Sequence, residues 1–212
     1  MSELPPLPGA IADIVVPGDP VSQAAWRWAH HSLPAYLLAH SIRSYFWGAA
    51  IAAEEGWAFD RRILWAASLM HDVGLTTIPR NATCFEVAGA EVARRFLVGQ
   101  GMDAAEAERA AISIVLHMQP GVTLDDGVES VLLDRATGLD VRGDGYELVD
   151  DVRPAVMRAY PRSAFDRRFL RAIEREVVQR PGCQSTRLLR ETDLAGWMAR
   201  SPWRRPTERR PR

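Results

Sequence analysis

The sequence predicts an all-α fold, and three observations lead to that prediction. Apolar residues recur at three- and four-residue spacing through most of residues 21–200, which is the period of an amphipathic helix. Glycines and prolines interrupt this pattern at helix-length intervals, for example at Gly56, Gly74 and Pro120, and such residues favour turns. Valine-rich pieces such as Ile14-Val15-Val16 are too short to build a sheet.

The first three helices have clear start and stop signals. We expect one helix over residues 21–32. Pro34 suits the first turn of a second helix because its missing N–H is not needed there, and that helix runs to about Glu55. Asp60 is expected to cap a third helix, which stops at Gly74.

The remaining helices are less sharply bounded. After a loop at 75–82, we expect helices over 84–98, from Asp103-x-x-Glu106 (a capping-box pattern) to His117, and from Asp125 or Asp126 to Asp140. Gly143 and Gly145 mark a turn. Later helices are expected at 151–159, at 163–179 with Ser163-x-x-Asp166 as its cap, and at 187–199.

We divide the chain into an N-terminal extension at residues 1–20, a single helical domain at 21–200 and an Arg/Pro-rich tail at 201–212. A length of 212 residues and an apolar fraction of 47% are enough for one domain with a full hydrophobic core. Within the tail, Trp203 is expected to make one docking contact.

Composition and charge indicate which partners and which cellular compartment to expect. A net charge of -1 argues against a general nucleic-acid binder. No stretch approaches the roughly 20 apolar residues of a membrane helix, and the N-terminus lacks the basic and apolar regions of a signal peptide. Cys84 and Cys183 have no metal-type spacing, so we expect free thiols in a reducing cytoplasm.

The His71-Asp72 dipeptide is the strongest functional signal. It ends an apolar helical run just before Gly74, and a buried imidazole beside a buried carboxylate is unfavourable unless a charged group holds both. His40 lies upstream and Asp140 downstream, each in an apolar helical context. Two imidazoles and two carboxylates would suit one divalent ion of zinc, iron, manganese or nickel better than calcium.

Five segments together resemble the cyanamide hydratase-like branch of the HD superfamily of metal-dependent hydrolases, over roughly residues 35–145. They are His40-Ser41-Ile42-Arg43-Ser44-Tyr45, Leu69-Met70-His71-Asp72-Val73-Gly74-Leu75-Thr76, Phe85-Glu86, His117 and Gly138-Leu139-Asp140. The resemblance implies an HD-type helical domain with its metal site in the bundle interior. It also implies that the metal ligands are His40, His71, Asp72 and Asp140.

Three residues are candidates for proton transfer. Asp72 can bind a metal through one oxygen and accept a proton from water with the other. His117 can exchange a proton with a substrate, or it can simply favour the helix C-terminus by its charge. Glu86 is either a further proton partner or a carboxylate that stabilises the first turn of its helix.

Other neighbours of the motifs have supporting or structural roles. Arg43 can orient Asp72 or Glu86 beside the metal, or form a structural salt bridge. Thr76 and Thr77 can place a hydroxyl near the pocket, although a loop cap is the simpler interpretation. The aromatic residues Tyr45, Phe46 and Trp47 are expected in the core.

Three functions remain open at this point. The first is a metal-dependent enzyme that adds metal-activated water to a small molecule by hydration or hydrolysis, with a cyanamide- or nitrile-like substrate. The second is an HD phosphohydrolase acting on a nucleotide or small phosphoester. The third is a non-enzymatic sensor that keeps a metal-containing pocket for a small molecule.

Two departures from related motifs bear on this choice. Many phosphohydrolases of the superfamily resemble His-Asp-x-Gly-Lys here, whereas this chain has Leu75 in place of the lysine and no lysine anywhere. His117 is the only histidine between His71 and Asp140, so one metal ion is expected rather than two.

The last 60 residues lie outside the resemblance and are expected to form a pocket lid or a homodimer contact.

Overall fold

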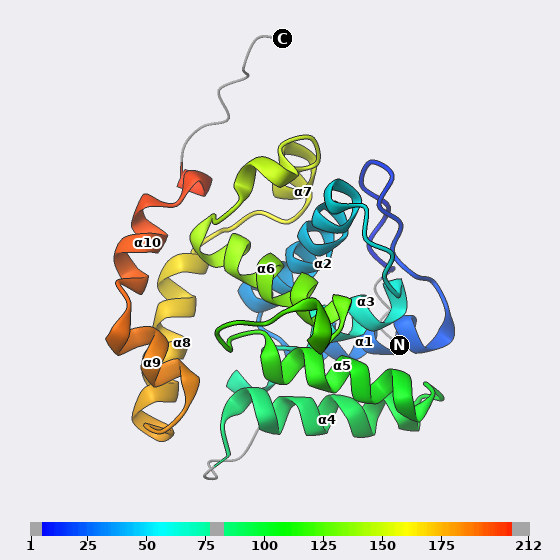
Figure 1. Cartoon of the computed structure of the whole chain (residues 1–212), viewed down its shortest axis with the longest axis horizontal. Helices are drawn as coiled ribbons and strands as arrows, with labels where there is room; N and C mark the ends of the chain where they lie inside the picture. The colour runs from blue at the N-terminus through cyan, green and yellow to red at the C-terminus, as the bar shows by residue number, and fades with distance from the viewer. Residues whose placement is uncertain (1–5, 77–82, 205–212) are drawn as a thin grey trace.

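Helix α2 (Ala35–Glu55) runs through the centre of the structure, a computed structural model that describes residues 6–76 and 83–204 (Figure 1). Its side chains are buried almost continuously from His40 to Ala52. Helix α6 (Val128–Arg142) packs along one side of α2 and α3 (Arg61–Met70) along another. This burial explains the high apolar content of all three segments.

The predicted boundaries of the first two helices and the predicted start of the third are confirmed, whereas α3 ends at Met70, and Gly74 lies in the 3-10 helix η1 (Val73–Leu75). Helix α1 (Pro20–Ser32) is capped by Asp19, whose carboxylate accepts the backbone N–H groups of Val21 and Ser22. Helix α2 ends at Gly56, which has a φ of 69° that suits glycine. Asp60 caps α3 as predicted, with its carboxylate bonded to the N–H groups of the first turn.

Helices α4 (Phe85–Gly99) and α5 (Ala104–Leu116) pack side by side at the edge of the bundle (Figure 1). Asp103 caps α5 by accepting from the N–H groups of Ala105 and Glu106. The side chain of Glu106 faces Arg62 on α3 at 3.3 Å. Asp103 is therefore the cap that the sequence predicts, while Glu106 ties α5 to α3.

The start of α6 differs from the prediction. Asp125 and Asp126 lie in a short 3-10 helix, η2 (Leu124–Asp126), and the Asp126 carboxylate bonds to the N–H of Thr123. Gly127, with a φ of 96°, begins α6 without a side-chain cap. The aspartate near the start of this helix therefore bonds within the preceding turn. Sequence patterns do not distinguish such an aspartate from a helix cap.

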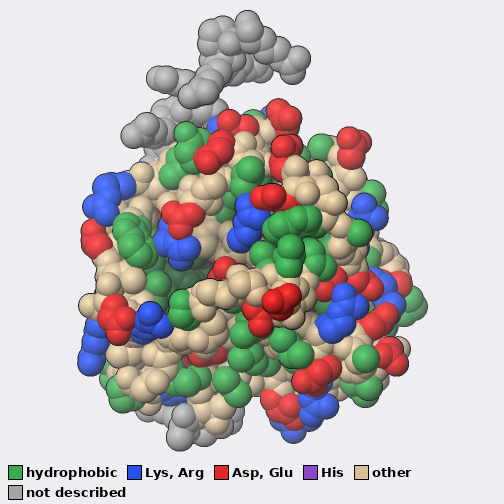
Figure 2. All heavy atoms as spheres, in the orientation of Figure 1, with side chains coloured by type: hydrophobic (Ala, Val, Ile, Leu, Met, Phe, Trp, Pro, Cys, Tyr) green, Lys and Arg blue, Asp and Glu red, His purple; other side chains and the backbone are tan. Residues whose placement is uncertain are grey.

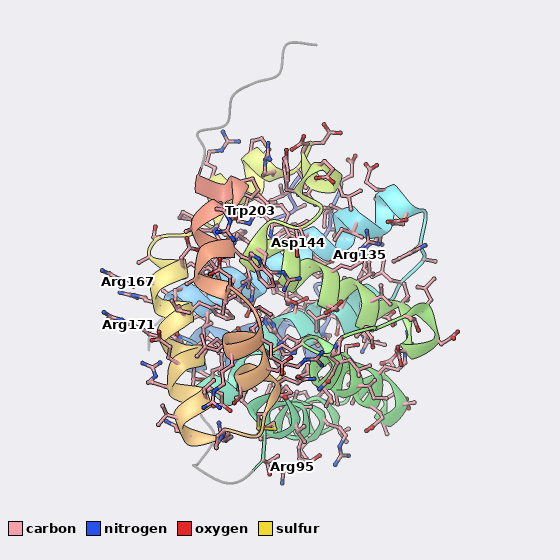
Figure 3. The ribbon with its side chains drawn as sticks, turned by 60° about the vertical axis from the view of Figure 1, so that its left-hand side comes forward. Arg95, Arg135, Asp144, Arg167, Arg171 and Trp203 are labelled. Carbon is pink, nitrogen blue, oxygen red and sulfur yellow. A yellow bond between two sulfur atoms is a disulfide. The ribbon has the colours of Figure 1, made fainter. Side chains whose placement is uncertain are left out.

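The chain continues beyond α6 with further helices. After the 3-10 helices η1 (Val73–Leu75) and η2, the later elements are η3 (Tyr146–Val149), α7 (Arg153–Ala159), α8 (Phe165–Gln179), α9 (Gln184–Glu191), α10 (Leu194–Arg200) and η4 (Pro202–Arg204). Arg167 and Arg171 extend outward from α8 (Figure 3), and its opposite face carries the buried Phe165 and Phe169.

Two predictions in this region are wrong. Ser163 does not cap α8, because the N-cap is Ala164, which has a φ of 55° and makes no side-chain cap bond. The single helix expected at 187–199 is two helices, α9 and α10. They are separated where Asp193 accepts the N–H of Gly196 and begins a new helix.

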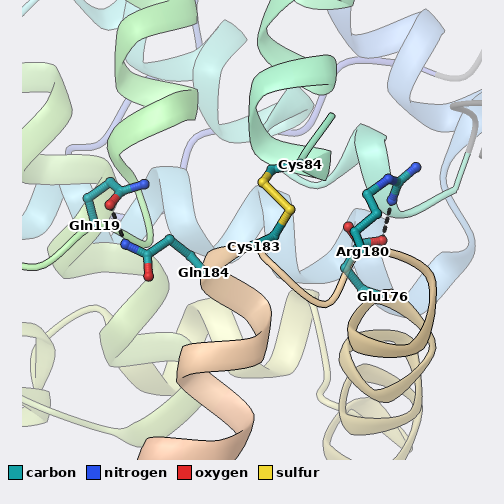
Figure 4. The surroundings of a disulfide bond; sticks show 6 residues. All are labelled: Cys84, Gln119, Glu176, Arg180, Cys183 and Gln184. Atoms are coloured by element: carbon teal, nitrogen blue, oxygen red, sulfur yellow. Dashed lines mark hydrogen bonds and ion pairs between the residues drawn. A yellow bond between two sulfur atoms is a disulfide. The ribbon is translucent and has the colours of Figure 1, made fainter. Parts of the chain in front are cut away.

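The cysteines also differ from the prediction of free thiols. Cys84 and Cys183 form a disulfide, with a Cα–Cα distance of 5.4 Å and 99 residues between them in sequence (Figure 4). Cys84 precedes α4 and Cys183 precedes α9. The bond therefore ties the start of α9 to the N-terminal half of the domain.

Trp203 makes the docking contact expected from the sequence. Its ring stacks on that of Trp47 with centroids 5.5 Å apart, and its Nε1 donates to the carbonyl of Leu139 at 2.9 Å. The all-α prediction is confirmed for the described part of the chain, where the sole extended pairing is a bridge between Ile11 and Ile14. None of the described helices has both the length and the apolar character needed to cross a membrane.

Candidate metal centre

The side chains of His40, His71 and Asp72 meet in the interior of the bundle. The Nε2 atoms of the two histidines lie 3.1 Å apart. Oδ2 of Asp72 lies 3.3 Å from Nε2 of His71 and 3.7 Å from Nε2 of His40. All three residues are only 1% exposed. The prediction that these residues come together in the bundle interior is therefore confirmed.

The end of α3 explains how two adjacent residues reach one point. Successive helix residues point about 100° apart, but α3 ends at Met70, and Asp72 has a φ of -99° and a ψ of 8° before η1 begins. Gly74 allows the start of α4 to close over this turn, since a Cβ there would lie 2.0 Å from the carbonyl oxygen of Phe85. A larger residue at this position would push the two segments apart.

The outer ring nitrogens of three histidines are already hydrogen-bonded. Nδ1 of His71 donates to the carbonyl of Ser68 at 2.8 Å, and Nδ1 of His117 donates to that of Ile114 at 2.6 Å. Nδ1 of His40 lies 2.7 Å from the Asp140 carboxylate. Because Nδ1 carries the proton, the Nε2 atom of each neutral ring has a lone pair for the interior of the site.

Asp140 is placed differently from its predicted role as a direct metal ligand. Arg43 donates to both of its oxygens at 2.7 Å, and Trp47 Nε1 donates to Oδ1 at 2.8 Å. Arg162 lies 3.1 Å from Oδ2. Burial raises the pKa of this carboxyl, but the two arginines outweigh burial and hold the pKa well below its usual range. Asp140 therefore contacts Nδ1 of His40, on the side of the ring away from His71, and is not part of the three-residue cluster.

Neighbouring charges and burial shift the pKa values of the site residues. Burial raises the pKa of Asp72, but the imidazoles of His71 and His40 outweigh burial and lower it to about 2. Burial lowers the pKa of His71, while Asp72 produces a net rise. Burial and the neighbouring His71 lower the pKa of His117 to about 4. At neutral pH, the site therefore contains an ionised Asp72 and an uncharged His117.

The cluster fits a divalent metal ion. Oδ2 of Asp72 is buried and has no hydrogen-bond partner among the described residues, and the two Nε2 atoms lie 3.1 Å apart, close enough to share one cation, either a proton or a metal ion. Zinc binds imidazole nitrogen at about 2.0–2.1 Å, so this separation permits one shared ion. Nitrogen and carboxylate donors without thiolate suit zinc, iron, manganese or nickel.

Residues 37–141 match the family model described as HD domain. The match includes His40, His71, Asp72 and Asp140. The match and the all-α fold support an HD-type helical domain in this part of the chain. HD domains generally bind divalent metals and belong to metal-dependent hydrolases, and the HD domain here holds a candidate metal site at its His40–His71–Asp72 cluster. No curated protein gives a significant match to the chain.

A cavity of about 360 Å³ opens onto the His40–His71–Asp72 cluster. Its floor is formed by His40, His71, Asp72 and His117. One wall is α6 and the opposite wall is α9, which lies outside the matched residues. Figure 2 shows a hollow between the C-terminal helices and α6. A volume of this size suits a small molecule.

Helix α9 covers the cavity and is held at its start by two contacts shown in Figure 4. The side chain of Gln184 bonds to that of Gln119, beyond the end of α5, and the disulfide joins Cys183 to Cys84. Arg187 and other residues of α9 line the cavity. The C-terminal part of the chain thus contributes to the cavity wall, and its expected role as a lid or a homodimer contact stays a prediction.

The other predicted site residues lie away from the cavity. Glu86 is buried in the first turn of α4 but is not among the described residues that line the cavity. Burial raises the pKa of Glu86, and the residues that act on its charge are Glu176 and Arg180. Thr76 caps its own turn by donating to the carbonyl of Val73 at 3.1 Å. Thr77 lies outside the described residues.

Arg43 is buried beside the site, as expected, but its partner is Asp140 and not Asp72 or Glu86. The aromatic residues Tyr45, Phe46 and Trp47 are buried in the core, as predicted. Trp47 also donates to Asp140, as described above, which joins the core to the site.

Sequence reasoning missed the residues of the two cavity walls. Asp134, Thr137, Gly138 and Val141 lie on one face of α6 and line the cavity. Their spacing of three, four and seven residues could have revealed the shared face. The residues of α9 have no comparable signal, because only the folded chain brings that helix over the HD domain.

Proposed function

We propose that this protein is a metal-dependent enzyme that adds water to a small molecule with an electrophilic carbon, of the nitrile, cyanamide or amide type. The observation that supports this best is the meeting of two imidazole nitrogens with a buried carboxylate oxygen, Oδ2 of Asp72, at the floor of a small cavity. Phosphoester hydrolysis and ligand sensing are alternative functions for the same pocket.

When bound, a divalent ion lowers the pKa of a coordinated water toward about 7 and polarises an electrophile beside it. The residues of the chain supply the rest. Asp72 offers a second oxygen that can accept a proton. His117 is uncharged at neutral pH because its pKa is about 4, and its Nε2 can accept a proton at the edge of the cavity floor. Phe169 packs near His40 and adds an apolar side chain to the cavity lining.

The walls of the cavity favour a carbon electrophile over a phosphoester. Arg142 and Arg187 line the cavity and would be the residues to bind a phosphate. However, Arg142 lies 2.5 Å from Asp144, and Arg187 lies 2.9 Å from Glu191. A phosphate would have to compete with these carboxylates for both arginines.

Metal analysis of the purified protein tests the site. We expect about one divalent ion per chain, which His71→Ala should remove. His31→Ala is a matched control, because His31 is an exposed histidine on α1 that bonds to the carbonyl of Arg27 and contacts the ring of His30. Metal content that is unchanged in His71→Ala would contradict the proposal.

Turnover of the metal-loaded protein tests the reaction. Cyanamide, acetonitrile, acetamide and p-nitrophenyl phosphate would be compared with the His71→Ala variant as a blank. We expect water addition to one of the first three substrates and none to the phosphoester. Turnover of the phosphoester alone would support the phosphohydrolase function, and metal binding without turnover on a wider panel would support the sensor.

A further inference from the structure

Asp134 places a carboxylate in the cavity wall without a partner. Its side chain lines the cavity from α6, and no hydrogen bond or ion pair joins that carboxylate to any residue within 6–76 and 83–204. Burial raises its pKa to about 6, so it is charged at neutral pH. A half-buried charge with no partner is unfavourable for folding and indicates a functional position.

The position of Asp134 on α6 separates it from the network around Asp140. Asp134, Thr137, Gly138 and Val141 share the face of α6 that borders the cavity. The Asp140 carboxylate is buried on another side of α6, toward Arg43 and Trp47 of α2. Asp134 is therefore a residue of the cavity wall and not part of the core.

Two arginines act on the charge of Asp134, and each forms its ion pair with another carboxylate. Arg135 lies 2.9 Å from Glu55 and packs over the ring of Trp57. Arg142 is paired with Asp144, as described above. Both arginines lower the pKa of Asp134, but burial raises it by more, so the net change is a rise. The negative charge of Asp134 is thus left to face the cavity.

The remaining polar groups near the cavity are mostly uncharged. Thr137 contributes a hydroxyl, and Gln119 and Gln184 contribute the side-chain amides that bond to one another. Arg187, on α9, is paired with Glu191. Beside the His40–His71–Asp72 cluster, the cavity therefore offers one unpaired carboxylate and several neutral hydrogen-bonding groups.

We propose that Asp134 determines substrate specificity by accepting N–H hydrogen bonds from an amino, amidine or guanidinium group of the substrate. The reacting carbon of the same molecule would face the His40–His71–Asp72 cluster. This inference rests on the proposed function and narrows its substrates to small nitrogen-rich molecules. A carboxylate in this position repels phosphates and carboxylates, and it binds a neutral or cationic N–H donor.

Binding of methylguanidinium to the zinc-loaded protein tests the inference without turnover. Isothermal titration at pH 8 would compare the wild type with Asp134→Asn, which keeps the size of the side chain and removes its charge. Asp125→Asn is a matched control, because Asp125 is exposed in η2. We expect affinity to fall at least tenfold in Asp134→Asn and to be unchanged in Asp125→Asn, with equal zinc content in all three proteins.

Inorganic phosphate serves as the opposite probe in the same titrations. Its affinity should rise, or at least not fall, when the charge of Asp134 is removed. Equal methylguanidinium affinity in wild type and Asp134→Asn would overturn the inference, as would no binding by the wild type. If no carbon substrate is turned over but the Asp134→Asn effect on binding persists, the proposed reaction fails and the role of Asp134 stands.

Discussion

Nδ1 of His40 lies 2.7 Å from Oδ2 of Asp140, on the side of the imidazole ring that faces away from His71. Such a carboxylate fixes the orientation of a metal-binding histidine and increases its basicity. The same Asp140 is held by Arg43 and Trp47. The positions of His40 and of the core around α2 thus depend on one buried carboxylate.

Replacing Asp140 by asparagine should therefore affect metal affinity and stability together. We expect metal affinity to fall by roughly 10–100-fold, the range for loss of a residue that orients a ligand. The free energy of unfolding should fall by about 3–5 kcal/mol, because Arg43 is left buried without its carboxylate. Competitive chelator titration and urea denaturation would measure the two effects. Complete loss of metal from a folded variant would instead indicate that Asp140 binds the ion directly.

Trp203 should stabilise the domain although it lies near the end of the described chain. Trp203→Ala removes the stacking on Trp47 and the hydrogen bond to Leu139. We expect a loss of about 2 kcal/mol, measured by urea denaturation. Trp203→Phe keeps the stacking and should lose about 1 kcal/mol or less. Equal stability of the alanine variant and the wild type would show that the contact is not maintained in solution.

The disulfide should contribute strongly to stability because it closes a long loop. Cys84 and Cys183 are 99 residues apart, for which loop-closure entropy predicts about 4–5 kcal/mol at most. Reduction with dithiothreitol should lower the urea midpoint and increase hydrogen exchange in α9. The double variant Cys84→Ser/Cys183→Ser should have the lower midpoint with or without the reductant. A midpoint of the wild type that does not respond to the reductant would contradict this prediction.

Asp134 should make folding less favourable at neutral pH. Its pKa is about 6 in the folded protein, against an ordinary value of 3.8. The folded state therefore holds this proton more tightly, and stability falls as pH rises from about 4 through 6. Asp134→Asn should be more stable than the wild type at pH 7–8, by on the order of 1 kcal/mol after solvent screening.

The difference between the two proteins should shrink below about pH 4, where Asp134 is protonated in both folded and unfolded chains. Arg135, Arg142, His117 and Arg187 are the other charged or titratable groups near this part of the cavity. They are common to both proteins, so their titration cancels in the difference. Thermal unfolding at a series of pH values would measure it, and a difference that does not vary with pH would contradict the prediction.

The sequence by itself determined most of the helices and the histidines of the candidate metal site. Asp60, Gly56 and Asp103 end or begin helices as local chemistry predicts, whereas Ser163 does not cap α8. His71 and Asp72 form a recognisable dipeptide at the end of an apolar helix. Local spacing and residue type carry this information.

Only the tertiary structure decided which groups face one another across the bundle. The contact of Asp140 with Arg43 spans 97 residues, and the disulfide joins positions 99 apart. The cavity wall that carries Asp134 is completed by α9. These pairings depend on how the helices pack, because several side chains of each type could satisfy the same local pattern. Packing therefore turned Asp140 toward the core and Asp134 toward the cavity.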